Sequence, residues 1–160
     1  MKLEEVLVAR AEDLTARADG NGKSYEYTQK PFASPAEGTG LAASFYELAP
    51  GKANYPYHYH LENEELLYII SGRGTLRTPS GEREVSAGDA IVCPPGPNGA
   101  HKLTNTSDEP LKYLDVDLVV PTNVCVYPDS GNVGIYSPLL DTILNLKGVA
   151  GYYDGEDAEK

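Results

Sequence analysis

Glycine and proline interrupt the middle of this chain so often that only short secondary-structure elements fit there. The 160-residue sequence contains 16 glycines and 12 prolines, and most of them lie between about residues 35 and 135. Glycine weakens a helix interior, and proline breaks it because proline lacks a backbone N–H and clashes with the preceding turn. The central part of the chain therefore has no room for a long helix, and the pattern predicts a fold of short strands.

The runs between these breaks are short, apolar or alternating, which is typical of strands. A hairpin is predicted where residues 75–78 and 82–85 flank the turn sequence Pro79-Ser80-Gly81. Further strands are expected at residues 41–48, 66–71, 90–93, 101–105, 112–120 and 123–127. Many short, evenly spaced strands indicate an antiparallel sandwich or barrel. Only residues 137–147 show the near-helical spacing of leucine and isoleucine that predicts a short helix.

Charge and cysteine content exclude several classes of partner. Lys and Arg number 13 against 24 Asp and Glu, so the formal net charge is −11, which repels nucleic acid and anionic membrane surfaces. No stretch approaches the roughly 20 apolar residues of a membrane span, and acidic residues occur too early in the first segment for a signal peptide. Cys93 and Cys125 match no zinc or redox spacing. We therefore expect a cytoplasmic protein with two unpaired thiols, a small-molecule partner, no nucleic acid and no membrane.

All three histidines of the chain belong to one pattern. His58 and His60 are one residue apart, so strand alternation places both side chains on the same face. Glu64 or Glu65 can return a carboxylate to that place, and His101 follows a glycine- and proline-rich turn farther along the chain. Three imidazoles and one carboxylate suit one divalent transition metal such as Mn, Fe, Ni, Co or Zn. Four protein ligands leave a coordination position open, as catalysis requires.

The spacing of these residues resembles the paired motifs of the cupin superfamily. The first motif matches Gly51, His58, His60, Glu65 and Gly72, and the second matches Gly88, Pro94, Gly96, His101 and Asn105. Two gaps, before His58 and before His101, are longer than in the family pattern, and the second gap lengthens the loop over the site. The resemblance covers roughly residues 40–120. Within the superfamily, the chain is similar to the small, single-domain, sugar-phosphate isomerase-like cupins of microbes.

The resemblance implies an all-β fold, a double-stranded β-helix or jelly-roll barrel, with short N- and C-terminal extensions. We accordingly assign residues 1–35 to the N-terminal extension, 36–128 to the barrel, and 129–160 to a C-terminal extension with the short helix and an acidic tail that frays from residue 154. The resemblance also implies a homodimer, and a metal at the barrel mouth held by His58, His60, Glu65 and His101. The spacing to Gly72 favours Glu65 over Glu64 as the carboxylate ligand.

Strand alternation predicts what else lines the site. Counting from Glu65, the inward positions on that strand are Leu67 and Ile69, whereas Leu66, Tyr68 and Ile70 face the other layer. On the strand expected at residues 112–120, we expect the apolar set to point inward. That assignment leaves the alternate set, which includes Asp115 and Asp117, in solvent.

The fold does not determine the function, so three classes of function stay open. The first is a metal-dependent isomerase, epimerase or lyase, in which the metal acts as a Lewis acid on a sugar phosphate or related carbonyl substrate without O₂. The second is an Fe-dependent dioxygenase, and the third is a non-catalytic module that binds a small ligand. The resemblance favours isomerase-like chemistry. A phosphate group would need a cationic clamp, for which Arg73, Arg77, Lys102 and Lys112 are candidates unless they are solvated counter-charges.

Overall fold

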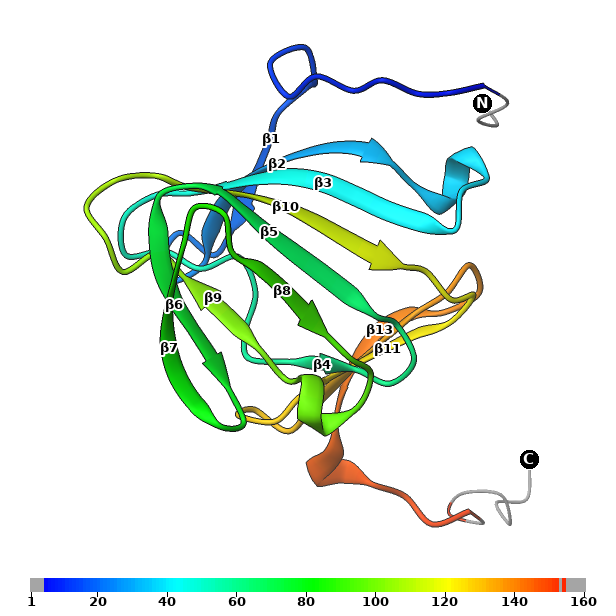
Figure 1. Ribbon diagram of the computed structural model, residues 1–160. Helices are drawn as coiled ribbons and strands as arrows, with labels where there is room; N and C mark the ends of the chain where they lie inside the picture. Colours follow the sequence, from blue (N-terminus) through cyan, green and yellow to red (C-terminus); the bar gives the residue numbers. More distant parts are fainter. Residues whose placement is uncertain (1–4, 153, 155–160) are drawn as a thin grey trace.

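The computed structural model describes residues 5–152 and 154, and these form an almost entirely β structure (Figure 1). The strands are β1 (Arg17–Gly20), β2 (Glu26–Ala33), β3 (Leu41–Leu48), β4 (Tyr59–His60), β5 (Glu65–Ser71), β6 (Arg73–Thr78), β7 (Gly81–Ser86), β8 (Ala90–Cys93), β9 (Lys102–Thr104), β10 (Leu111–Leu118), β11 (Asn123–Tyr127), β12 (Asn132–Tyr136) and β13 (Asp141–Asn145). Three 3₁₀ turns are η1 (Pro35–Glu37), η2 (Pro97–Gly99) and η3 (Leu146–Gly148). Among these residues no helix has the length and apolar character needed to cross a bilayer.

The strands form two layers that enclose a common interior. A six-stranded sheet in the order β1-β2-β3-β10-β5-β8 makes one layer, and two smaller sheets, β13-β12-β11-β4 and β7-β6-β9, lie opposite it (Figure 1). Neighbouring strands pair antiparallel, and the predicted hairpin is present as β6 and β7, with Thr75 opposite Glu84. The predicted all-β double-stranded β-helix is confirmed. β1 and β2, inside the predicted N-terminal extension, add to the large sheet by pairing with each other and with β3.

The predicted helix at residues 137–147 is wrong, because residues 141–145 form strand β13 and the last two residues belong to the 3₁₀ turn η3. β13 pairs along its whole length with β12, from Asn132 opposite Asn145 to Tyr136 opposite Asp141. Leu139 is almost fully exposed, and Ile143 and Leu144 are about half exposed. The regularly spaced leucines therefore do not form the buried face of a helix. The backbone of this segment forms its hydrogen bonds with β12 instead. Most of the predicted fraying tail, residues 155–160, lies outside the described residues.

A glycine allows the tight passage from β5 into β6. Gly72 has φ of 83°, in the left-handed region that favours glycine. A Cβ at this position would lie 2.5 Å from the carbonyl oxygen of Pro110, so a larger residue would push apart the β5–β6 and β9–β10 connections. The sequence motif that ends at Gly72 therefore marks a turn where both conformation and space exclude a side chain.

The apolar core fills one end of the barrel. On the inner face of the large sheet, Leu111 lies opposite Leu48 and Tyr113 lies opposite Ile69, and all four side chains are fully buried or nearly so. Side chains from the opposite layer close the core: Leu76, Val85 and Leu103. Leu67, predicted to point inward, is also buried. Leu48 at the end of β3, Leu111 at the start of β10 and Ile69 toward the end of β5 place the centre of this core away from Glu65.

Toward the other end, the same inner face becomes polar, which corrects one prediction. Asp115 and Asp117 do not lie in solvent: Asp115 is 5% exposed, and Asp117 is half-buried opposite Glu65 on β5. The cause is the register of β10, in which the buried Leu111 and Tyr113 decide the inward set. Every second residue must follow them to the same face. Burial of a leucine and a tyrosine thereby carries two carboxylates toward the candidate site.

The outward set of β5 corrects a second prediction. Leu66, Tyr68 and Ile70 are 37%, 42% and 45% exposed on the outer face of the large sheet, so no second layer of the described residues covers them. Val92 on β8, opposite Leu66, is also exposed there. The outer face of these two edge-side strands is thus apolar, and the homodimer stays a prediction.

Candidate metal centre

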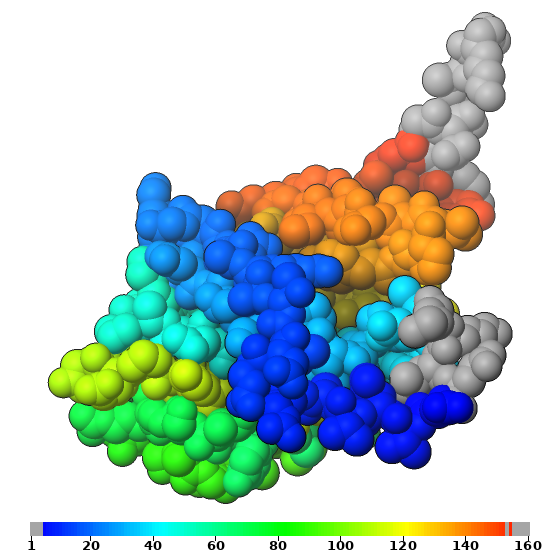
Figure 2. Space-filling model, turned by 90° about the horizontal axis from the view of Figure 1, so that it is seen from above, coloured from blue at the N-terminus to red at the C-terminus, as the bar shows by residue number. Residues whose placement is uncertain are grey.

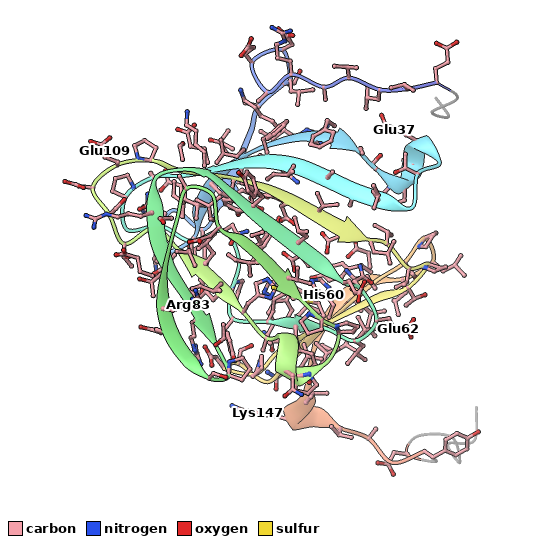
Figure 3. The ribbon with its side chains drawn as sticks, in the orientation of Figure 1. Glu37, His60, Glu62, Arg83, Glu109 and Lys147 are labelled. Carbon is pink, nitrogen blue, oxygen red and sulfur yellow. The ribbon has the colours of Figure 1, made fainter. Side chains whose placement is uncertain are left out.

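The structure brings together the four side chains that the sequence singles out. His58 and His101 face each other across an antiparallel bridge, with N–O distances of 3.1 and 2.8 Å, and His60 follows on β4. Glu65 reaches them from the first position of β5 in the opposite layer. Its Oε2 lies 3.9 Å from Nε2 of His58, 3.4 Å from Nε2 of His60 and 3.1 Å from Nε2 of His101. Figure 3 shows His60 in the interior between the layers, whereas Glu62 points away at the outer edge.

Each imidazole is oriented by an oxygen at its other nitrogen. Nδ1 of His58 lies 2.8 Å from the Pro56 carbonyl, and Nδ1 of His101 lies 3.0 Å from the Gly99 carbonyl. Nδ1 of His60 lies 2.9 Å from Oδ1 of Asn123. Carbonyl oxygens only accept hydrogen bonds, so each Nδ1 carries the proton in the neutral ring. Each Nε2 is then a bare lone pair directed at Glu65, the arrangement that prepares histidine to bind a metal.

These residues fit a divalent metal because the pocket is short of positive charge. Oε2 of Glu65 is buried and accepts no hydrogen bond. Three imidazole lone pairs that face a carboxylate oxygen in a buried space repel one another unless a cation or a proton lies between them. Nitrogen and oxygen donors in this number are the set that borderline divalent metals prefer. Glu65 is buried beside the histidines, whereas Glu64 is exposed, and the choice of Glu65 as the ligand stays a prediction.

Two further side chains that the sequence analysis did not assign as ligands also lie within reach of a metal. The ligand atoms of His58, Glu65 and His101 lie within 4.8 Å of one another, and so do those of two other groups: His60 with Glu65 and Asp117, and His58 with His60 and Cys125. Cys125 is opposite His60 in the pairing of β11 with β4. Cys93 and Cys125 are both free, as predicted, and both are buried. The donor set is therefore richer than the predicted quartet.

Without a metal, protons on the histidines balance the charge of Glu65. Burial, together with the neighbouring His101, lowers the pKa of His58 to about 4. Burial also acts to lower the pKa of His101, but the Glu65 carboxylate outweighs it and raises that pKa to about 11. Burial opposes ionisation of Glu65, yet His101 holds the pKa of this carboxyl well below its usual range. The metal-free centre is thus a His101–Glu65 ion pair whose proton a metal would replace.

Tyrosines form much of the remaining wall of the metal pocket, a cavity of about 320 Å³. Tyr46 and Tyr55 line one side with their hydroxyl oxygens 2.8 Å apart, and Tyr127 and Tyr136 line another with theirs 3.1 Å apart. Burial raises the pKa of Tyr46, Tyr55 and Tyr127 above the ordinary value, so these phenols stay neutral. Sequence reasoning missed these wall residues; the available signal was compositional, twelve tyrosines in a chain without tryptophan.

Asp115 and Asp117 line the same pocket and are short of partners. Oδ1 of each carboxyl is buried and makes no hydrogen bond. Burial, and secondarily the charge of Glu65, raises the pKa of Asp117 to about 7. The same causes raise the pKa of the more deeply buried Asp115 well above its usual range. In the metal-free pocket Asp117 can therefore both release and accept a proton near neutral pH.

The four cationic residues considered for a phosphate clamp do not line this pocket. Arg77 donates two hydrogen bonds to Asp129, at 2.6 and 2.9 Å, and its guanidinium lies 3.9 Å from the centre of the Tyr57 ring. The others make surface contacts: Arg73 with Glu84, Lys112 with Glu47 and Lys102 with the ring of Tyr25. Among the described residues that line the metal pocket there is no lysine or arginine.

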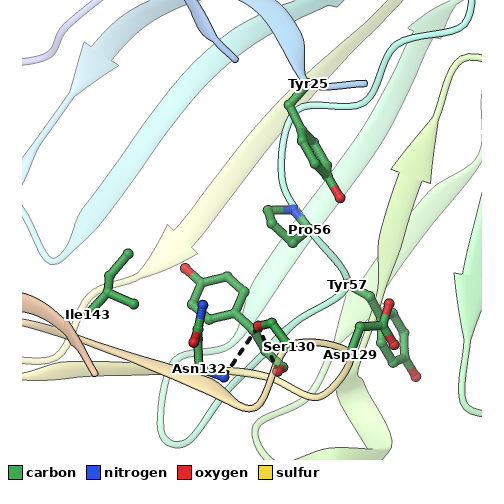
Figure 4. Close-up of a pocket in the computed structure, with 8 residues that line it drawn as sticks. Tyr25, Pro56, Tyr57, Asp129, Ser130, Asn132 and Ile143 are labelled. Carbon is green, nitrogen blue, oxygen red and sulfur yellow. Dashed lines mark hydrogen bonds between the residues drawn. The ribbon is translucent and has the colours of Figure 1, made fainter. Parts of the chain in front are cut away.

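A separate outer pocket of about 420 Å³ is lined by Tyr127 and by residues that Figure 4 labels. Its wall includes Tyr25, Pro56, Tyr57 and Ile143, and Ser130 beside them is held between the carbonyl of Tyr127 and the backbone N–H of Asn132. Tyr127 also lines the metal pocket, so the outer pocket and the metal pocket have this residue in common.

Comparisons with known proteins agree with this geometry. Residues 44–117 match a family model described as the cupin domain. An uncharacterized protein of Methanocaldococcus jannaschii is 40% identical over 57 residues, which are 36% of this chain and 44% of the relative. The match thus spans less than half the length of that curated relative.

Solved structures share the fold. A sugar phosphate isomerase from a cupin superfamily, from Silicibacter pomeroyi, gives a TM-score of 0.77 at 19% identity and covers 92% of this chain and 98% of that one. A predicted oxalate decarboxylase of Thermotoga maritima gives a TM-score of 0.64 at 24% identity and covers 71% of this chain and 100% of that one. At such identities the likeness shows a common fold, on which different reactions are built.

Proposed function

Because the chain belongs to the cupin superfamily, we propose that it is an enzyme that binds one divalent transition metal and isomerises a small, uncharged hydroxy-carbonyl compound. The proposed ligands are His58, His60, Glu65 and His101. The observation that carries the proposal is the convergence of three Nε2 atoms, at 3.1 to 3.9 Å, on an unpartnered and buried oxygen of Glu65. Mn, Fe, Co, Ni and Zn all accept this donor set.

The residues around the metal pocket supply what isomerisation needs besides the metal. A bound metal would contribute Lewis acidity that polarises a carbonyl or hydroxyl oxygen. Asp117 lines the pocket and is half-buried, so its carboxyl is placed to take a proton from one carbon and return it to the next. The neutral hydroxyls of Tyr46, Tyr55 and Tyr127 can donate hydrogen bonds to substrate oxygens.

The charge of the pocket favours an uncharged substrate over a phosphorylated one. Three carboxyl groups line it, those of Glu65, Asp115 and Asp117, and no lysine or arginine does among the described lining residues. Apart from the proposed metal, a phosphate dianion would find no cation in this pocket to pair with, and the carboxylates would repel it. We therefore infer a free sugar or related hydroxy-carbonyl compound, in contrast to the sugar phosphate named for the Silicibacter pomeroyi protein.

Metal analysis tests the binding half of the proposal. Purified wild-type protein should contain about one divalent metal per chain, and His101→Ala should contain almost none because it removes a buried ligand. Asp117→Asn and Cys125→Ala serve as matched controls and should keep the metal, since both side chains lie close but outside the proposed quartet. Equal metal content in wild type and His101→Ala would reject the site. Loss of metal in either control would show that the substituted residue is itself a metal ligand.

A substrate screen tests the reaction. The metal-restored protein is incubated under nitrogen with ketoses, aldoses and their phosphates, and interconversion is followed by NMR in D₂O to detect proton exchange. We expect turnover of a free sugar without O₂ and its loss in Asp117→Asn. Turnover only with Fe(II) in air would establish a dioxygenase instead. Tight binding without turnover would establish a binding module.

A further inference from the structure

A second cavity, of about 560 Å³, opens directly beside the metal pocket. It lies between the segment from η1 to β3, the end of β10 and the β12–β13 connection, which meet at one end of the molecule (Figure 1). In Figure 2 the light-blue residues near 35–40 and the orange residues near 130–140 face each other across a hollow at this place. Asp117, Asn123 and Tyr136 line both cavities. The two spaces therefore share a wall and adjoin.

A buried amide whose oxygen has no hydrogen-bond partner belongs to the wall of this second cavity. Asn63 lines it, is only 2% exposed, and its Oδ1 accepts no hydrogen bond. The backbone around it is fixed, because Leu61 N–H donates to the Val124 carbonyl and Leu118 N–H donates to the Glu64 carbonyl, both at 2.9 Å. Asn63 is thus held in place by neighbours that leave its side-chain oxygen free.

Such an unpaired group is costly unless a ligand completes it. A buried acceptor without a partner destabilises the folded state relative to one that is paired. Oδ1 of Asp117 is in the same condition and lines the same cavity, so two acceptors are available within it. Neither has a partner among the described residues, which indicates that both are reserved for donors that arrive from outside the chain.

We propose that this cavity is a second substrate subsite, in which Asn63 and Asp117 accept hydrogen bonds from the hydroxyl groups of an unbranched, uncharged polyhydroxy chain. The proposal rests on the proposed function, because the reacting end of the same molecule lies in the metal pocket. Apolar wall residues, Val119, Val120, Pro121 and Pro138, contact the C–H faces of the chain. Asp117 and Asp141 are the charged residues among the described lining, so an anionic tail is excluded.

Chain length is the measurable consequence. A three-carbon compound is held in the metal pocket, and each added CHOH group extends toward Asn63. Isothermal titration calorimetry on the metal-loaded protein should use glycerol, erythritol, xylitol and sorbitol, which are uncharged, unbranched and cannot isomerise. We expect affinity to rise about tenfold from three to six carbons, because one added hydrogen bond in a dry site contributes about 1.4 kcal/mol.

The Asn63→Leu variant separates binding from folding. It should lose about tenfold in sorbitol affinity, leave glycerol binding unchanged, and melt no lower than wild type, because leucine replaces an unpaired polar group with a similar volume. Asn132→Leu is the matched control. Asn132 lines the outer pocket, and its Oδ1 already accepts a hydrogen bond from Asn145. This variant should keep the length dependence.

Each outcome supports or rejects the subsite. Alditol affinity that is independent of chain length, or unchanged sorbitol binding in Asn63→Leu, overturns the second subsite and leaves the metal proposal standing. A lower melting temperature for Asn63→Leu with unchanged length dependence would assign Asn63 a structural role instead. If no alditol binds although metal analysis finds a loaded site, the polyhydroxy substrate class itself is rejected together with the subsite.

Discussion

The two ends of the central strands are built from the same sheet yet have opposite character. At one end, Leu48, Leu111 and Tyr113 are fully buried and pack against apolar neighbours. At the other end, Asp115, Asp117 and Glu65 occupy the same inward alternation and carry buried oxygens without hydrogen-bond partners. One end gains stability from burial, and the other loses stability to the desolvation of charge.

This difference separates folding from function within a single strand. β10 passes from Leu111 to Asp117 in six residues, so packing at its start decides where the carboxylates at its end must point. Functional sites in stable proteins commonly retain polar groups that reduce stability. Here the apolar end offsets that cost and holds the register that the polar end requires.

The largest expected change in stability comes from a substitution at the apolar end. Leu111→Ala removes a fully buried side chain that packs in the core, and should reduce the free energy of unfolding by about 2–5 kcal/mol. Because the four proposed ligands lie at the other end, the variant should still bind about one metal per chain while it is folded. Urea unfolding combined with metal analysis measures both. A variant of wild-type stability would show that the core is not centred at this end.

A pH series sharpens the comparison at the polar end. The folded-state pKa of His101 is raised from about 6.5 to about 11, so this residue's contribution to stability is full below pH 6.5 and is lost as the pH rises toward 11. The metal-free protein should therefore become less stable between pH 7 and 9. Metal affinity should rise over the same range, by up to about tenfold per pH unit, because the proton on His101 competes with the metal.

Chemical denaturation of metal-free and metal-loaded protein at three pH values in this range tests the prediction. The loaded protein should lack the alkaline loss, since His101 is then deprotonated in both the folded and the unfolded state. His101→Gln should reduce the pH slope of the metal-free protein, and Asp115 accounts for slope that is left. Stability of the metal-free wild type that rises from pH 7 to 9 would contradict the assignment of the proton to His101.

The smallest expected change in stability comes from removing a buried carboxyl at the polar end. Asp115→Asn replaces a buried carboxyl, whose pKa burial raises well above its usual range, with a neutral group of the same shape. Since the ionised form of Asp115 is disfavoured by burial, the variant should be more stable by about 1 kcal/mol at pH 8 and indistinguishable at pH 4. Thermal melts at the two pH values measure the difference. A stability loss at pH 8 would mean that the Asp115 carboxylate has a stabilising partner.

Much of the metal centre could be predicted from the sequence because its signals are local. His58 and His60 share a face through simple alternation. Gly72 marks a tight turn, and the spacing from that turn identifies Glu65 rather than Glu64 as the predicted ligand. The inward direction of Asp115 and Asp117 could not be predicted in this way. Alternation divides a strand into two sets without saying which set is buried, and the decision lies in the long-range packing of Tyr113 against β3 and β5.

The helix predicted at residues 137–147 was wrong for a related reason. Ile143 and Leu144 satisfy a helical spacing, but the backbone partner that makes this segment a strand is β12, and short apolar runs do not distinguish the two structures. The second cavity was equally inaccessible to sequence reasoning, since its walls come from segments far apart in the chain. Asn63 gave no signal, because an asparagine in a turn is ordinary until its burial is known.

The acceptors at the three imidazoles have a consequence for how relatives of this chain can diverge. His58 and His101 are oriented by main-chain carbonyls, which no substitution at a single side chain can delete. His60 alone is oriented by a side chain, that of Asn123. Evolution can therefore adjust the electron-donating strength of this ligand through one codon, for instance by exchanging the amide for a carboxylate. Position 123 is the place where mutation can retune the reactivity of the centre without rebuilding the barrel.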